Sequence, residues 1–146
     1  MPKRFTIGEA ESLLPRISEF LREAIILKTG YQEAEQAFAT MTRRITSMGG
    51  MALDRRRAAQ MRLNRDRTAQ SLKKTIEILE ETGCVVKDLD IGLVDFPTLF
   101  RGREVYLCWK LGEPAIAFWH ETSEGFAGRR SIDPEFLSEH QGDTPS

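Results

Sequence analysis

Apolar residues recur in steps of three and four along the first third of the chain. Such steps form the heptad seam of a helix that packs on a partner helix. Thr6 and Glu9 have capping-box spacing, so we predict a helix from about Ile7 to Met48, kinked or restarted at Pro15. The seam consists of Ala10, Leu13, Ile17, Phe20, Ala24, Leu27, Tyr31, Ala34, Phe38, Met41, Ile45 and Met48.

Gly49-Gly50 is a turn signal, and a second helical segment runs from about Met51 to Thr82. Its last part has an apolar stripe, whereas its first part is crowded with arginines. The first helix would be roughly 60 Å long, more than a small globule covers. We therefore expect the distal part of the hairpin to expose Phe38, Met41 and Ile45 and to form a coiled-coil homodimer through them.

The second half of the chain changes to the period of two that is typical of strands. Strands are predicted at residues 84–88, 92–100, 103–111 and 115–121, with turns at Arg101-Gly102 and at Gly112-Glu113. The fold class is α+β: a long antiparallel helical hairpin packed on a small antiparallel β-meander of three to four strands. We expect one domain over residues 1–137, with the hairpin at about 7–82, the meander at about 84–132 and a disordered tail at 138–146.

The two turns predict which residues share a face of the sheet. Two-residue turns make the paired residue numbers sum to 203 in the first hairpin and to 225 in the second. One face is then an apolar core face that ends at His120. The other face is mixed, with aromatic residues in the middle and carboxylates at one end: Asp95, Leu99, Glu104, Tyr106, Cys108, Lys110, Ala117, Trp119 and Glu121.

The mixed face is the candidate ligand or metal face, and we assign to it Glu104, Tyr106, Trp119, Glu121 and Asp95, with His120 nearby. Glu104 is predicted to lie opposite Glu121, which is destabilising unless something neutralises the pair. An arginine (Arg101, Arg103, Arg129 or Arg130) would do so, and so would a metal, a cationic ligand or a shared proton. Asp95 is expected about 13 Å from Glu104, too far to join it.

Three further patterns leave alternatives open. His120 is either a hydrogen-bonded packing residue, a general base or a metal ligand, and a zinc site with Cys84 and Cys108 has no diagnostic spacing. The two cysteines are expected to be free thiols. The loop before Arg129 and Arg130 either closes on the sheet or presents both arginines to an anion.

Composition and charge exclude few classes of function. The net charge is −1 over 146 residues, so no overall field attracts nucleic acid or membranes. The segment from Arg43 to Lys74 contains ten basic residues and only two acidic ones, Asp54 and Asp66. This excess of positive charge keeps nucleic-acid binding as an alternative. We expect no signal peptide and no membrane span, hence a cytoplasmic protein without a membrane partner.

Several longer motifs resemble the bacterial family catalogued as domain of unknown function 2203. The motifs lie at residues 5–15, 87–97, 107–114, 118–121 and 125–130. The resemblance as a whole covers about residues 4–132. Ser131 stands where such sequences commonly carry proline. The resemblance implies no activity, but it directs attention to Asp95, Trp109, His120, Glu121 and Arg129.

The sequence therefore predicts an uncharacterised, homo-oligomeric interaction or ligand-binding module. A metal-dependent or small-ligand-dependent enzyme using the mixed face is one alternative, and nucleic-acid binding through the arginine-rich helix is another. Neither a cofactor, a substrate nor an enzyme class follows from the residues.

Overall fold

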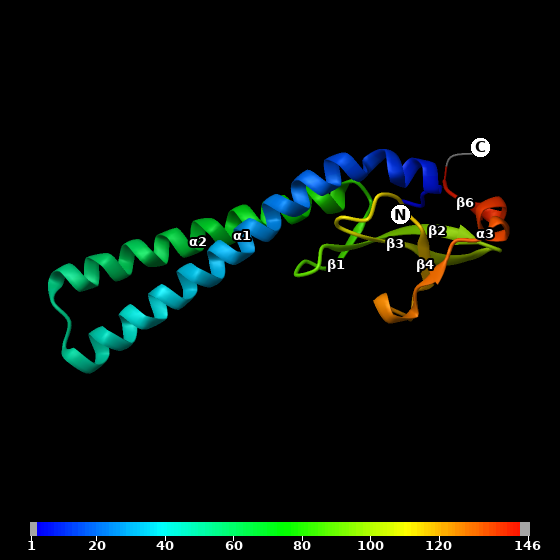
Figure 1. Ribbon diagram of the computed structural model, residues 1–146. Coiled ribbons are helices and arrows are strands. Elements are labelled where there is room, and N and C mark those ends of the chain that lie inside the picture. The colour runs from blue at the N-terminus through cyan, green and yellow to red at the C-terminus, as the bar shows by residue number, and fades with distance from the viewer. Residues whose placement is uncertain (1–2, 144–146) are drawn as a thin grey trace. The chain divides into compact units, whose positions relative to one another are not determined.

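Two long helices precede a sheet in the computed structural model, which describes residues 3–143 (Figure 1). Helix α1 is Ile7–Met48 and helix α2 is Ala52–Glu81. The predicted capping box is confirmed: the Thr6 and Glu9 amides donate to each other's side chains at 3.0 and 3.1 Å. The helix does not restart at Pro15, because α1 continues through it as one element.

The sheet contains more strands than the sequence predicts. Strands β1 (Val85–Asp88), β2 (Leu93–Phe100), β3 (Arg103–Lys110) and β4 (Phe118–Glu121) form an antiparallel meander. Two short strands extend it: β5 (Arg130–Ser131) pairs with β4, and β6 (His140–Gln141) pairs with β2. The α+β class is confirmed, with six strands among residues 3–143 in place of the predicted three or four.

The chain forms two compact units. One consists of residues 1–22 and 76–146, and the other of residues 23–75. In the first unit, one face of the sheet packs under the start of α1, whose Ala10, Leu14, Ile17 and Leu21 are buried. The predicted seam positions Leu13 and Phe20 lie at the edge of that core. The sheet instead packs against the apolar side chains next to the seam, Leu14 and Leu21.

The C-terminal segment is ordered further than the sequence predicts, because the end of its short helix and strand β6 fall inside the predicted tail at 138–146. Residues 126–128 form the 3-10 turn η1 (Phe126–Gly128), and α3 is Pro134–Glu139. Phe136 of α3 is 1% exposed and stacks on Trp119 with ring centroids 4.9 Å apart. His140 accepts a hydrogen bond from the Ile7 amide at 3.0 Å. These contacts order the chain through Asp143, and the last three residues of the predicted tail lie outside the described part.

The second unit is the distal part of the hairpin. Its helices are in contact: Arg65 of α2 pairs with Glu35 of α1 at 3.7 Å, and its guanidinium lies 4.8 Å from the ring centre of Phe38. These contacts join the two helices within the second unit. Across residues 3–143 no helix is both long enough and apolar enough to cross a membrane.

Candidate metal centre

The register of strand β4 decides the composition of both faces of the sheet. The first predicted register is confirmed, with Asp95 opposite Cys108 and a number sum of 203. The second is wrong by one residue: Tyr106 lies opposite His120, giving 226 in place of 225. A shift of one residue moves every side chain of a strand to the other face.

The shift follows from the connection between β3 and β4. Residues 111–117 form a seven-residue loop in place of the predicted two-residue turn. Glu113 holds this loop, because its carboxylate accepts from the Lys110 amide at 2.7 Å and its carbonyl accepts from the Trp109 indole at 3.0 Å. The loop is longer than a two-residue turn, so the turn rule does not fix the register.

Three donor side chains meet on the face that the shift creates. Asp95 of β2, Cys108 of β3 and His120 of β4 place a carboxylate oxygen, Sγ and a ring nitrogen within 4.8 Å of one another. All three residues are buried, at 1%, 0% and 1% exposure. We refer to them as the Asp95–Cys108–His120 cluster.

His120 is held at both ring nitrogens. Nδ1 lies 2.7 Å from the Glu121 carbonyl oxygen, which accepts only, so Nδ1 carries a proton. Nε2 lies 3.0 Å from each carboxylate oxygen of Asp95. One further proton therefore lies between Nε2 and Asp95, and the pair as a whole is neutral.

Burial dominates the electrostatics of the other two members. Desolvation raises the pKa of Asp95, while the neighbouring His120 and Lys87 oppose that rise. Desolvation, with a smaller contribution from Asp95, raises the pKa of the Cys108 thiol to about 12. Near neutral pH, Cys108 is a thiol, so without a bound cation it is a poor nucleophile.

Aromatic and cationic side chains cover the cluster. The Lys87 ammonium lies 4.6 Å from the ring centre of Tyr106, whose ring is 5.6 Å from that of His120. The Arg129 guanidinium lies 4.0 Å from the ring centre of Phe118 and donates to the Cys108 carbonyl oxygen at 3.4 Å.

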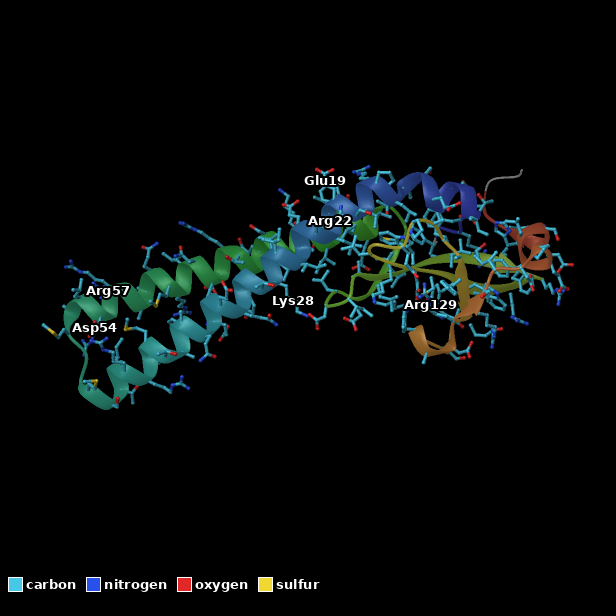
Figure 2. The ribbon with its side chains drawn as sticks, in the orientation of Figure 1. Glu19, Arg22, Lys28, Asp54, Arg57 and Arg129 are labelled. Atoms are coloured by element: carbon cyan, nitrogen blue, oxygen red, sulfur yellow. The ribbon has the colours of Figure 1, made fainter. Side chains whose placement is uncertain are left out.

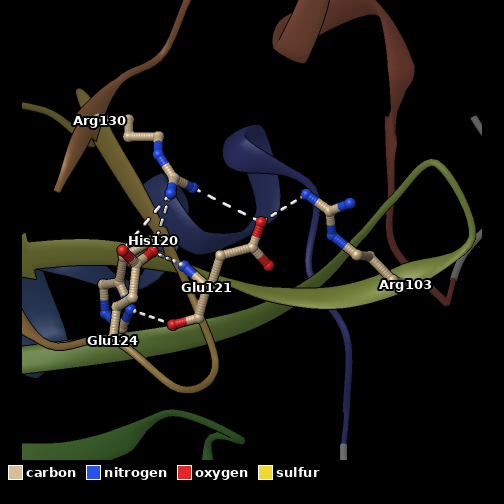
Figure 3. A network of polar contacts seen from close by, with 5 residues as sticks. All are labelled: Arg103, His120, Glu121, Glu124 and Arg130. Atoms are coloured by element: carbon tan, nitrogen blue, oxygen red, sulfur yellow. Dashed lines mark hydrogen bonds and ion pairs between the residues drawn. The ribbon is translucent and has the colours of Figure 1, made fainter. Parts of the chain in front are cut away.

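Two residues assigned to the mixed face lie on the opposite face. Trp119 packs in the core, with its ring 5.3 Å from that of Phe100. Glu121 forms ion pairs with Arg103 and Arg130 (Figure 3). Glu104 remains on the mixed face and pairs with Arg4 at 3.4 Å. The two glutamates therefore do not face each other, and arginines neutralise both.

The two candidate anion-binding arginines already have carboxylate partners. Arg129, labelled in Figure 2, pairs with Glu113 at 2.6 Å. Arg130 pairs with Glu121 and with Glu124, the latter at 3.2 Å. Both arginines thus tie the loop that contains η1 to the sheet and to the loop before β4.

The predicted oligomer seam lies in the second unit and is half-buried. Phe38, Met41 and Ile45 are each partly covered. An open groove of about 400 Å³ remains beside two of them, lined by Phe38, Thr42, Ile45, Thr46, Arg55, Ala58, Ala59, Arg62 and Leu63.

The sequence predicts Asp95, Tyr106 and Cys108 on one face, but it places His120 on the other face, and the structure brings His120 to join them. Cys84, the other cysteine of the suggested zinc set, is a buried free thiol that donates to the Leu79 carbonyl oxygen at 3.2 Å. Alternation within β4 could not reveal the register, because its two adjacent aromatic residues fit either face.

Comparison with protein families identifies the group to which the chain belongs. Residues 3–132 match the model of DUF2203, described as an uncharacterized conserved protein, and the chain is a member of that family. Neither a curated protein nor a solved structure matches the chain.

Proposed function

We propose that this DUF2203 member binds a transition-metal ion of the zinc class through the Asp95–Cys108–His120 cluster. The observation that carries the proposal is the convergence of three buried donor atoms within 4.8 Å. Sulfur, imidazole nitrogen and carboxylate oxygen are the donor types that Zn²⁺ accepts. His120 adds a nitrogen donor to the predicted mixed face, and the complete set of donors favours an ion of the zinc class.

The spacing of the His120 and Asp95 donors fits such an ion with little movement. Zinc bonds of about 2.0–2.3 Å set tetrahedral ligand atoms roughly 3.3–3.7 Å apart. His120 Nε2 and the Asp95 oxygens are 3.0 Å apart, so they need to separate by only a few tenths of an ångström. The ion would replace the proton between them.

The surroundings of His120 support the same role. A metal-bound histidine generally donates its other ring N–H to a carbonyl or carboxylate, which orients the ring. The Glu121 carbonyl oxygen takes that position at 2.7 Å. Three protein ligands leave one position of a tetrahedral ion open, as in catalytic rather than structural zinc sites.

Cobalt titration of the full chain tests the proposal. After chelator treatment, we expect one Co²⁺ per chain and a thiolate-to-cobalt charge-transfer band. C108S should abolish the band, and D95N and H120Q should abolish one-to-one binding. C84S is the matched control, since it changes the other buried cysteine and should leave the band intact. Absence of binding to the wild type, or a band that survives C108S, would refute the proposal.

A second candidate function is self-association through the hairpin. The groove in the second unit has an apolar floor that includes Phe38, Ile45 and Leu63, and Leu63 is 50% exposed. A second copy of the hairpin would cover such a floor. Arg55 and Arg62 line the same groove, so two copies would repel until salt screens them.

Sedimentation velocity at micromolar concentration tests this candidate. We expect a dimer fraction that increases with salt and that the variant I45E removes. I26E provides a control, because Ile26 is also in the second unit, is 70% exposed and does not line the groove. A strict monomer at all salt concentrations would exclude the dimer.

A further inference from the structure

The turn of the hairpin exposes a cluster of apolar side chains. Met48 and Met51 are 75% and 76% exposed, and Leu53 is 56% exposed. They flank Gly49 and Gly50, whose positive φ angles of 74° and 28° form the turn. Nothing in the described second unit covers these three side chains, and clustered exposed apolar side chains are typical of an interaction surface.

Arginines surround the same end of the hairpin. Arg55, Arg56 and Arg57 are consecutive, and a helix rotates by about 100° per residue, so their side chains leave α2 in three directions. Arg43 and Arg44 occupy the last turns of α1. All five are exposed, and among the described residues none forms an ion pair with a carboxylate. Figure 2 labels Arg57 beside Asp54, at the start of α2.

We propose that this end of the hairpin docks end-on onto an anionic lipid bilayer. The five arginines lie within roughly 9 Å of the turn along the helix axes, so one plane of lipid phosphates is within reach of them all. Long arginine side chains extend to the phosphate level while their stems lie against apolar surface. Met48, Met51 and Leu53 then enter the boundary between headgroups and acyl chains.

The direction of the arginines favours a bilayer over a nucleic-acid duplex. A duplex lying along the hairpin would contact one side of it, and Arg55, Arg56 and Arg57 do not share a side. A duplex also offers no apolar interior for Met48 and Met51. End-on docking would give the protein a lipid partner, contrary to the expectation from the sequence, but it requires no spanning helix, and α1 and α2 provide none.

Vesicle flotation with the full chain tests the inference. Binding to vesicles of phosphatidylglycerol and phosphatidylcholine is compared with binding to pure phosphatidylcholine. A basic residue near an anionic surface contributes about fivefold in binding, so R56Q/R57Q should weaken binding to anionic vesicles by roughly 25-fold. M48S/M51S/L53S should weaken it by at least about tenfold.

R62Q/R67Q is the matched control, because it removes the same charge farther from the turn. Arg62 lies about 15 Å and Arg67 about 22 Å along α2 from its first residue. Both distances exceed the Debye length of about 10 Å at 0.1 M salt, so less than about a threefold loss is expected. Circular dichroism checks that each variant keeps its helix content.

Three results would overturn the inference: equal binding to both kinds of vesicle, an equal loss in the two arginine pairs, or tighter binding to a duplex than to anionic vesicles. The salt dependence of the unmodified chain is an independent measurement. Binding that does not weaken between about 0.05 and 0.5 M salt would exclude the electrostatic contact.

Discussion

Replacement of His120 by leucine isolates the buried pair at the centre of the cluster. In the metal-free protein, H120L removes both 3.0 Å contacts to Asp95, which is 1% exposed. An unpaired buried carboxylate costs about 3–5 kcal/mol, so Asp95 instead takes up a proton. Protonation of a carboxyl with an unfolded pKa of about 3.9 costs about 1.4 kcal/mol per pH unit above that value. The expected cost is about 3.5 kcal/mol at about pH 6.5.

The cost should fall steeply as the pH is lowered. The wild type keeps both His120 contacts to Asp95, so its buried carboxyl does not have to take up a proton in this way. In H120L only the folded state carries the proton, because burial holds the pKa of Asp95 above its unfolded value. The H120L variant is therefore most stable below about pH 4, and it loses stability as the pH rises above that value.

Urea unfolding of both proteins at about pH 6.5 and pH 4.5 measures the effect. The destabilisation by H120L should fall from about 3.5 to about 1 kcal/mol, with unchanged m-values. D95V/H120L removes both polar partners and should regain most of the lost stability without this pH dependence. A cost that is the same at both pH values, or a double variant as unstable as the sum of the single ones, would refute the neutral-pair description.

Three shorter predictions use the same unfolding assay. F136A should lower the free energy of unfolding by about 3–5 kcal/mol, because Phe136 is 1% exposed. A loss below about 1 kcal/mol would mean that α3 is not part of the core. Between about pH 9 and 12, wild type should lose up to about 1.4 kcal/mol per pH unit more than C108A, because burial raises the pKa of Cys108 to about 12; parallel curves would contradict this. G92A should destabilise more than G102A: both glycines have positive φ, at 68° and 79°, but only at Gly92 would a Cβ meet Leu111 Cβ, at 2.6 Å.

Local signals in the sequence were sufficient for the helices and for the first hairpin of the sheet. The capping box at Thr6 and Glu9 gives the start of α1. Arg101 and Gly102 have φ angles of 53° and 79°, as a two-residue turn with two left-handed positions requires. That turn fixes the pairing of β2 with β3, and therefore the opposition of Asp95 and Cys108.

The second register depends on tertiary contacts that local patterns do not contain. The loop at 111–117 is held by the Glu113 contacts and by the Ile116 amide, which donates to Glu11 of α1 at 3.2 Å. Glu11 is distant in sequence, so turn chemistry alone could not predict the loop. The C-terminal helix did carry a local signal, because Asp133 caps the Phe136 amide at 2.7 Å with Pro134 at the first helical position.

The chemistry of Cys108 distinguishes the metal proposal from a catalytic triad built on the same three residues. A nucleophilic cysteine needs a lowered pKa and access to substrate, whereas Cys108 is 0% exposed with a pKa raised to about 12. A metal ion reverses that situation, because a coordinated thiol loses its proton even in an apolar site. The ion would also displace the proton that His120 and Asp95 share. Metal binding should therefore release about two protons per chain near neutral pH, which titration calorimetry in buffers of different ionisation enthalpy measures. Binding with no proton release would mean that the ion is held elsewhere.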